Sequence, residues 1–124
     1  MNEKNKNNMI QDESKAFAIR IINLYKYLRE NKHELVLSKQ LLRSGTSIGA
    51  NISESVFGQS DMDFISKLSI ALKESNETRY WLELLHETNY LDDKQFISIY
   101  DDCEKIKATL INIINTTKKN RKNH

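Results

Sequence analysis

Apolar residues recur at steps of three and four over most of the chain, which is the spacing of one face of an α-helix. Four such runs, separated by short polar segments, predict helices over about 14–31, 36–57, 60–88 and 92–118. The predicted buried seams are Phe17, Ile21, Leu24 and Leu28; Leu41, Gly45, Ile48 and Ile52; Phe64, Leu68, Ala71, Ser75, Thr78, Leu82 and Leu85; and Phe96, Ile99, Cys103, Ile106, Leu110, Ile113 and Thr117.

Local signals mark the predicted helix ends. Ser60 with Asp63, and Asp92 with Gln95, have the spacing of N-terminal caps, and Gly58 is a candidate stop. The 124 residues contain no proline and three glycines, so the tight turns of a sheet protein have few candidates. We therefore predict an all-α, antiparallel up-down-up-down four-helix bundle. It forms a single domain over 1–124, with about 1–12 and 119–124 as flexible tails.

Two of the three glycines lie inside the second predicted helix, in the segment SKQLLRSGTSIGANISE. A glycine in a helix costs roughly 1 kcal/mol relative to alanine, so Gly45 and Gly49 need a compensating reason. We predict close packing against a neighbouring helix.

Further apolar side chains lie off the main seams, so some helices are apolar over more than one face. This surplus predicts self-association. Its members are Ile19, Ile70, Tyr80, Leu84, Ile97, Tyr100, Ile111 and Ile114.

The charges are unevenly distributed, although the formal net charge is only +2. Residues 1–43 hold nine Lys or Arg against five acids, residues 44–117 hold six against twelve, and the tail from Lys118 adds four cations. On a monomer such basic ends are usually a solvated surface. On an oligomer they repeat around a rim and attract nucleic acid. The candidate contacts are Lys15, Arg20, Lys26, Arg29, Lys118, Lys119, Arg121 and Lys122.

A polar stripe accompanies the apolar seam of the second helix, at the same three- and four-residue steps. It is either an ordinary solvent face or a hydrogen-bonded network between helices or subunits, in which Arg43 pairs with Glu74 or Glu77. We favour the network. The set comprises Gln40, Arg43, Ser47, Asn51, Glu54, Glu74 and Glu77.

Catalytic and metal-binding patterns have little support. Glu83 and His86 form one E-x-x-H pair, but a di-iron bundle needs two that face inward, and the pairs ending at His33 and His124 lie in a loop entrance and the tail. Arg79 and His86 have the spacing of the R-x(4 to 6)-H element of HEPN-type ribonucleases, a weak signal on its own. We expect no enzyme activity, no metal and no cofactor.

Two further observations concern the setting of the protein. The single cysteine, Cys103, lies among apolar neighbours and is predicted to be an inert core thiol. The N-terminal segment lacks the apolar core of a signal peptide, and charges interrupt every apolar run well short of a membrane span. We expect a cytoplasmic protein without membrane contact.

The segments QLLRSGTSIGANISES and DFISKLSIALKESNETRYWLELL resemble the bacterial four-helix-bundle proteins encoded by intervening sequences in 23S rRNA genes. Relatives of that family include the accessory variability protein of diversity-generating retroelements. The resemblance implies a homopentamer, and in the retroelement relatives a basic surface that engages nucleic acid and a reverse transcriptase. The matching positions are Gln40, Arg43, Ser47, Asn51 and Glu54, then Phe64, Ala71, Glu74, Glu77, Tyr80, Trp81 and Leu85.

Our leading hypothesis is a non-enzymatic oligomeric scaffold that binds RNA, DNA or a nucleic-acid enzyme through its basic positions. The alternative is a protein-interaction module that assembles and captures one protein partner without nucleic acid. A HEPN-like ribonuclease is a remote third.

Overall fold

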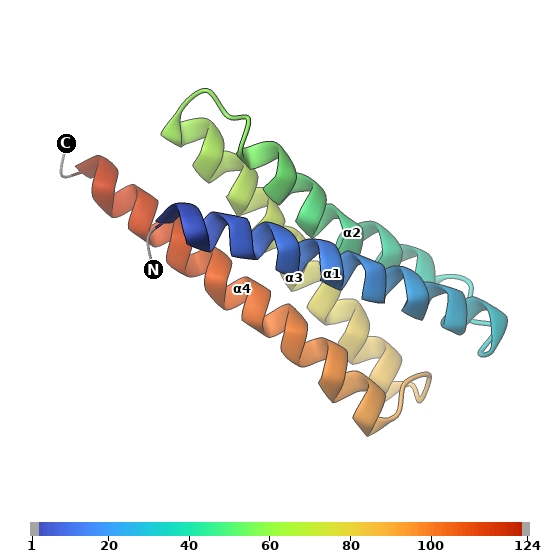
Figure 1. Ribbon diagram of the computed structural model, residues 1–124. Helices are drawn as coiled ribbons and strands as arrows, with labels where there is room; N and C mark the ends of the chain where they lie inside the picture. Colours follow the sequence, from blue (N-terminus) through green and yellow to red (C-terminus); the bar gives the residue numbers. More distant parts are fainter. Residues whose placement is uncertain (1–2, 123–124) are drawn as a thin grey trace.

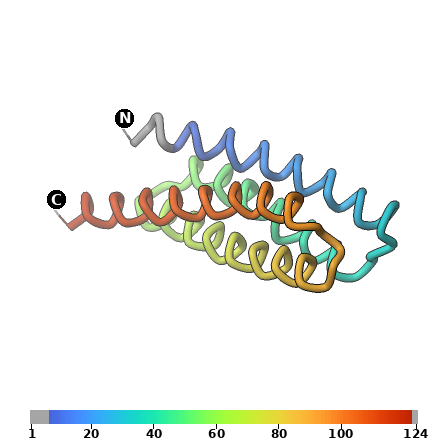
Figure 2. Tube along the Cα trace, turned by 90° about the horizontal axis from the view of Figure 1, so that it is seen from below, coloured from blue at the N-terminus to red at the C-terminus, as the bar shows by residue number. Residues whose placement is uncertain are grey.

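The structure, a computed structural model, describes the backbone of residues 3–122 and the side chains of residues 7–122. Four helices make up nearly all of it: α1 (Glu3–Glu30), α2 (Leu37–Ser55), α3 (Asp61–Glu87) and α4 (Asp93–Lys122). They run antiparallel in sequence order, so the two chain ends and the α2–α3 loop lie at one end of the bundle (Figures 1 and 2). The all-α up-down-up-down prediction is confirmed.

Each helix packs against two others, and the fourth contacts the first to close the bundle. The α1–α4 interface is the least extensive of the four, and shallow grooves of about 590 and 500 Å³ lie along it. Arg20 lines both grooves, because its guanidinium crosses from α1 to contact Asp102 and Ser98 on α4.

The predicted seams form the core. Nearly every seam position is buried, and Leu24, Phe64 and Phe96, the exceptions, are partly buried against the same cluster. Cys103 is buried, and burial raises the pKa of its thiol to about 12, as expected of an inert core residue. Of the off-seam set, Ile114 is buried and Leu84 and Tyr100 are half-buried. The other five are exposed: Ile19, Ile70, Tyr80, Ile97 and Ile111.

The first and last helices are longer than predicted. α1 begins at Glu3 rather than near Ser14, because Ile10 and Ser14 extend the seam of Phe17 by the same steps and are themselves buried at 1% exposure. The helix thus continues into the segment we expected to be a tail. α4 likewise runs past Lys118 to Lys122. Residues 1, 2, 123 and 124, including His124, lie outside the described residues.

The predicted caps of α3 and α4 are confirmed. Ser60 Oγ accepts from the Asp63 N–H at 3.1 Å. Asp92 and Gln95 form a reciprocal pair, in which each backbone N–H donates to the other side chain, at 2.9 and 2.7 Å. Both helices therefore begin where side-chain acceptors satisfy their first free N–H groups.

The start of α2 has a cap that the sequence did not signal. Its N-cap residue, Val36, has no side-chain acceptor, and the carboxylate of Glu34 accepts from the backbone N–H groups of Val36, Leu37 and Ser38 at 3.1, 2.9 and 2.6 Å. Burial alone would raise the pKa of Glu34, but these backbone hydrogen bonds outweigh it and the pKa lies below its ordinary value.

The two helical glycines allow α2 to approach α1 closely, as predicted. A Cβ on Gly45 would lie 2.8 Å from two side-chain carbons of Ile21, and a Cβ on Gly49 would lie 3.3 Å from the carbonyl oxygen of Ser14. Gly58 also permits close packing, because a Cβ there would lie 3.1 Å from the Asp63 Cβ and 3.2 Å from the Phe64 backbone nitrogen. None of the three glycines has a positive φ, so a left-handed backbone conformation is not the reason for glycine at these positions.

Candidate functional site

The polar stripe of α2 faces α3, and its central contact is the predicted one. The Arg43 guanidinium contacts Glu74 at 3.2 Å through one nitrogen and Glu77 through the other. The indole N–H of Trp81 also donates to the Glu77 carboxylate, at 3.3 Å. One arginine thus links two carboxylates one turn apart on the neighbouring helix.

The charged forms of Arg43 and Glu77 stabilise each other. The hydrogen bond to Glu77 raises the pKa of Arg43, and the same bond lowers the pKa of Glu77. The Arg43 side chain is half exposed, so solvent weakens the attraction and the pair contributes little to stability. Beneath it, the buried Thr78 hydroxyl donates to Ser44 at 2.9 Å, so polar contacts extend from the surface into the α2–α3 seam.

The remaining stripe residues have mainly local partners. Ser47 donates to the Arg43 carbonyl at 2.6 Å, and Asn51 donates to the Ser47 carbonyl at 2.8 Å. Glu54 pairs with Lys67 of α3 at 2.7 Å, and Gln40 is exposed. The stripe therefore connects α2 to α3 within one chain through Arg43 and Glu54.

The predicted nucleic-acid contacts on α1 divide into two groups. Arg20 is engaged in the bundle, at 2.5 Å from Asp102 and 2.9 Å from Ser98 Oγ. Arg29 lies over the ring of Tyr25, with 5.3 Å between guanidinium carbon and ring centroid, and is half-buried. Lys15 and Lys26 are exposed.

The four cations at the end of α4 are all exposed, and among the described residues none forms an ion pair with an acid. Lys118, Arg121 and Lys122 line a hollow of about 470 Å³ together with Met62 and Ile65 of α3, and Arg121 approaches the Met62 sulfur at 2.9 Å. Lys119 is the fourth member. This group, Lys118, Lys119, Arg121 and Lys122, is called the α4 basic end below.

A second polar cluster, between α3 and α4, was not predicted. Arg79 Nε donates to the Tyr100 hydroxyl at 2.7 Å and to Glu83 at 3.2 Å, and Tyr100 in turn donates to Glu83 at 2.8 Å. Glu104 lies 3.6 Å from Arg79. Glu83 lies four residues after Arg79 on the same helix, a spacing that the sequence displays. Tyr100 and Glu104 come from α4, and no short-range pattern in the sequence marks them.

This cluster bears on the HEPN-like spacing of Arg79 and His86. Arg79 is held by its three oxygen partners, and His86 stacks on Phe96 at 4.2 Å while its Nε2 lies 2.7 Å from Asp93. Both side chains thus have structural partners, and nothing in the arrangement points to catalysis. Among the side chains of residues 7–122, no group of three His, Cys, Asp or Glu is placed to hold a metal ion.

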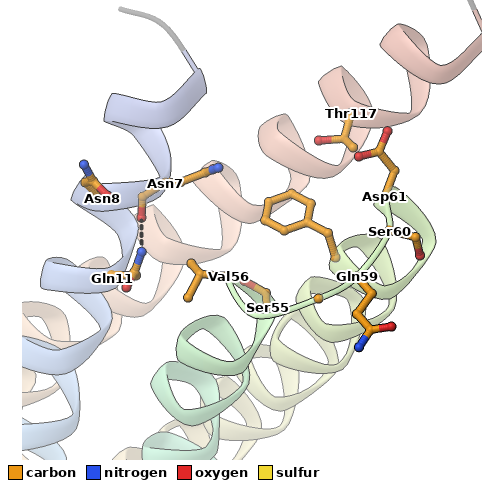
Figure 3. A pocket seen from close by; sticks show the side chains of 11 residues that line it. Asn7, Asn8, Gln11, Ser55, Val56, Gln59, Ser60, Asp61 and Thr117 are labelled. Atoms are coloured by element: carbon orange, nitrogen blue, oxygen red, sulfur yellow. Dashed lines mark hydrogen bonds between the residues drawn. The ribbon is translucent and has the colours of Figure 1, made fainter. Parts of the chain in front are cut away.

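A concave pocket of about 550 Å³ lies at the end of the bundle that carries the termini (Figure 3). Residues 7–11 of α1, the end of α2, the α2–α3 loop, the start of α3 and the end of α4 surround it. Its lining is mostly neutral and polar: Asn7, Asn8, Gln11, Ser55, Val56, Gly58, Gln59, Ser60, Asp61, Phe64 and Thr117.

None of the helices in the described part of the chain is both long and apolar enough to cross a membrane.

Comparison with known proteins gives a family and a solved relative. The family model for the 23S rRNA-intervening sequence protein matches residues 6–112. A crystal structure from Bacteroides thetaiotaomicron, of a protein with unknown function from the S23 ribosomal protein family, is 56% identical, with a TM-score of 0.88. The alignment covers 89% of this chain and 98% of that one. A comparison with curated proteins found no match.

Proposed function

The chain belongs to the 23S rRNA-intervening sequence protein family, and we propose that it is a non-enzymatic, self-associating helical scaffold that binds nucleic acid through the α4 basic end. The observation that carries the proposal is the contrast between two sets of cations. Arg20, Arg43 and Arg79 are paired with acids of the same chain, whereas the four side chains of the α4 basic end are exposed and unpaired with acids among the described residues.

Four exposed cations within five residues are a good electrostatic match to a phosphate backbone. Binding that neutralises phosphates releases their counterions, which is a large part of the affinity of basic proteins for nucleic acid. Cations in the last turn of a helix also complement its dipole, so local helix stability is the competing explanation for their presence. The test below separates the two roles.

Self-association supports the scaffold role because it would repeat the basic end on every copy. The exposed apolar side chains favour such assembly, and Phe57, 80% exposed in the α2–α3 loop, is the most exposed of them. A homopentamer is the assembly that the family resemblance implies. Five chains of 14.5 kDa would give a mass of about 72.5 kDa by light scattering, and 14.5 kDa would contradict assembly.

The experiment compares three proteins in a fluorescence-anisotropy titration with labelled RNA and DNA at low salt. The first is the wild type, and the second carries Lys118→Gln, Lys119→Gln, Arg121→Gln and Lys122→Gln. The matched control carries Lys39→Gln, Lys73→Gln, Lys94→Gln and Lys105→Gln, four exposed lysines elsewhere, so both variants lose the same charge.

We expect the wild type and the control to bind, and the α4 variant to lose most of its affinity while keeping its helical circular-dichroism spectrum. Equal losses in both variants would show that only net charge matters. No binding by the wild type would refute the nucleic-acid function.

A protein-interaction module is the second candidate, favoured by the exposed apolar residues and the ordered Arg43 contact. It predicts that Arg43→Ala with Asn51→Ala abolishes assembly or capture of a protein partner and leaves nucleic-acid affinity unchanged. Retained assembly in that variant would count against this candidate.

A further inference from the structure

The end pocket differs in chemistry from the basic surface beside it. Among the described residues its lining contains no cation, and Asp61 is its one carboxylate. The adjoining hollow, which shares the start of α3 and the end of α4, is lined by Lys118, Arg121 and Lys122. A hydrogen-bonding concavity with one carboxylate and no cation among its described residues therefore lies next to a cationic one.

Four of the pocket's polar side chains are carboxamides, namely Asn7, Asn8, Gln11 and Gln59. Asn7 and Gln11 lie on its α1 side, where the Gln11 side-chain amide donates to the backbone carbonyl of Asn7 at 3.4 Å (Figure 3). The side-chain oxygen of Asn7 is buried and has no hydrogen-bond partner among the described residues. Carboxamides present a donor and an acceptor side by side, which is the pattern that base edges complement.

Apolar groups complete the lining. Val56 from the loop and Phe64 from α3 contribute apolar surface, and Phe64 is half-buried, so its position is fixed by the core. Unstacked bases bind proteins by laying their faces on such side chains while their edges form hydrogen bonds. A phosphate would gain no cation inside this pocket and would face Asp61, whereas a neutral base would gain both kinds of contact.

We propose that the end pocket receives one unpaired base of a single-stranded nucleic acid whose phosphates contact the α4 basic end. The inference rests on the proposed function and adds a strand preference to it. In a duplex the bases are stacked and paired, so a duplex offers the phosphates without the base.

The experiment compares two oligonucleotides of equal length and charge, one with normal bases and one with abasic tetrahydrofuran sites at every position, each about ten nucleotides long. Abasic strands keep the phosphates and remove the pocket's ligand. The proteins are the wild type, the variant Asn7→Ala with Gln11→Ala, and a control with Asn23→Ala and Asn76→Ala at exposed helical positions. RNA and DNA versions of the normal strand show whether the sugar matters.

We expect the wild type and the control to bind the normal strand at least about fivefold more tightly than the abasic strand. The Asn7 and Gln11 variant should bind the two strands nearly equally, with unchanged affinity for the abasic one. Equal wild-type affinity for both strands would overturn the base pocket and leave the proposed function standing. A preference that survives in the pocket variant would overturn the assignment to this pocket, and absence of all binding would overturn both proposals.

Discussion

Substitution of Gly45 by alanine tests whether this glycine is present because α1 lies against it. The new Cβ would lie 2.8 Å from both Cγ1 and Cγ2 of Ile21 and 3.1 Å from its Cδ1, whereas unstrained carbon contacts are about 3.5–4.0 Å. Relief of that overlap should cost about 1–3 kcal/mol, as in other overpacked cores. Alanine returns about 1 kcal/mol of helix propensity. The net expectation is destabilisation by about 1 kcal/mol.

Ile21→Ala provides the matched background, because it removes every Ile21 atom within 3.1 Å of the new Cβ. On its own it should cost about 2–5 kcal/mol as a large-to-small core change. In that background Gly45→Ala should stabilise by about 1 kcal/mol, since only the helix-propensity gain remains. The double-mutant cycle should thus give a coupling energy of about 2 kcal/mol between the two positions.

The assay is urea unfolding followed by circular dichroism, at one fixed protein concentration because assembly would couple to stability. Gly49→Ala serves as a second control, because its Cβ would meet the Ser14 carbonyl oxygen at 3.3 Å, a much smaller overlap. Stabilisation by Gly45→Ala in the wild-type background, or a coupling energy near zero, would refute the close-packing explanation.

Three further predictions follow from the polar contacts and the core thiol. Glu34 has a lowered pKa in the folded state, so its contribution is present above the unfolded pKa and is lost as the pH falls through the folded pKa. Glu34→Gln should cost about 1 kcal/mol in urea unfolding at neutral pH and nearly nothing in acid; an equal cost at both pH values would contradict the cap. Cys103 should react with a thiol reagent only on unfolding, because its pKa is raised to about 12 and it is buried; rapid reaction in native buffer would disprove this. Arg43→Ala should change the free energy of unfolding by at most about 1 kcal/mol, since its side chain is half exposed, and a loss of several kcal/mol would mean that the pair is buried in an assembly.

Periodicity explains why the core was predictable from the sequence. The seams of Leu41 and Leu68, for example, depend only on spacing along one helix, which the chain itself displays. The Arg43 contact with Glu74 was predictable for a related reason, because two amphipathic helices joined by a short loop place neighbouring stripes side by side.

The missed features depend on geometry between distant or irregular segments. Ile10 continues the seam spacing through Ser14, but it lies in an Asn- and Lys-rich stretch, and the structure shows that the bundle extends far enough to bury it. Glu34 caps α2 from inside a polar break, where a glutamate carries no recognisable cap signal. The Arg20 contact with Asp102 joins residues 82 apart in sequence, so it requires knowledge of how α1 meets α4.

The salt dependence of nucleic-acid affinity tests the central claim most directly. If all four cations of the α4 basic end contact phosphates of a single strand, the logarithm of the binding constant should fall with the logarithm of salt concentration with a slope near −3 per chain, from about −0.7 for each of four contacts. The variant with those four residues changed to glutamine should show a slope near zero. Wild-type binding without salt dependence, or none at low salt, would contradict the proposal that this scaffold binds nucleic acid electrostatically.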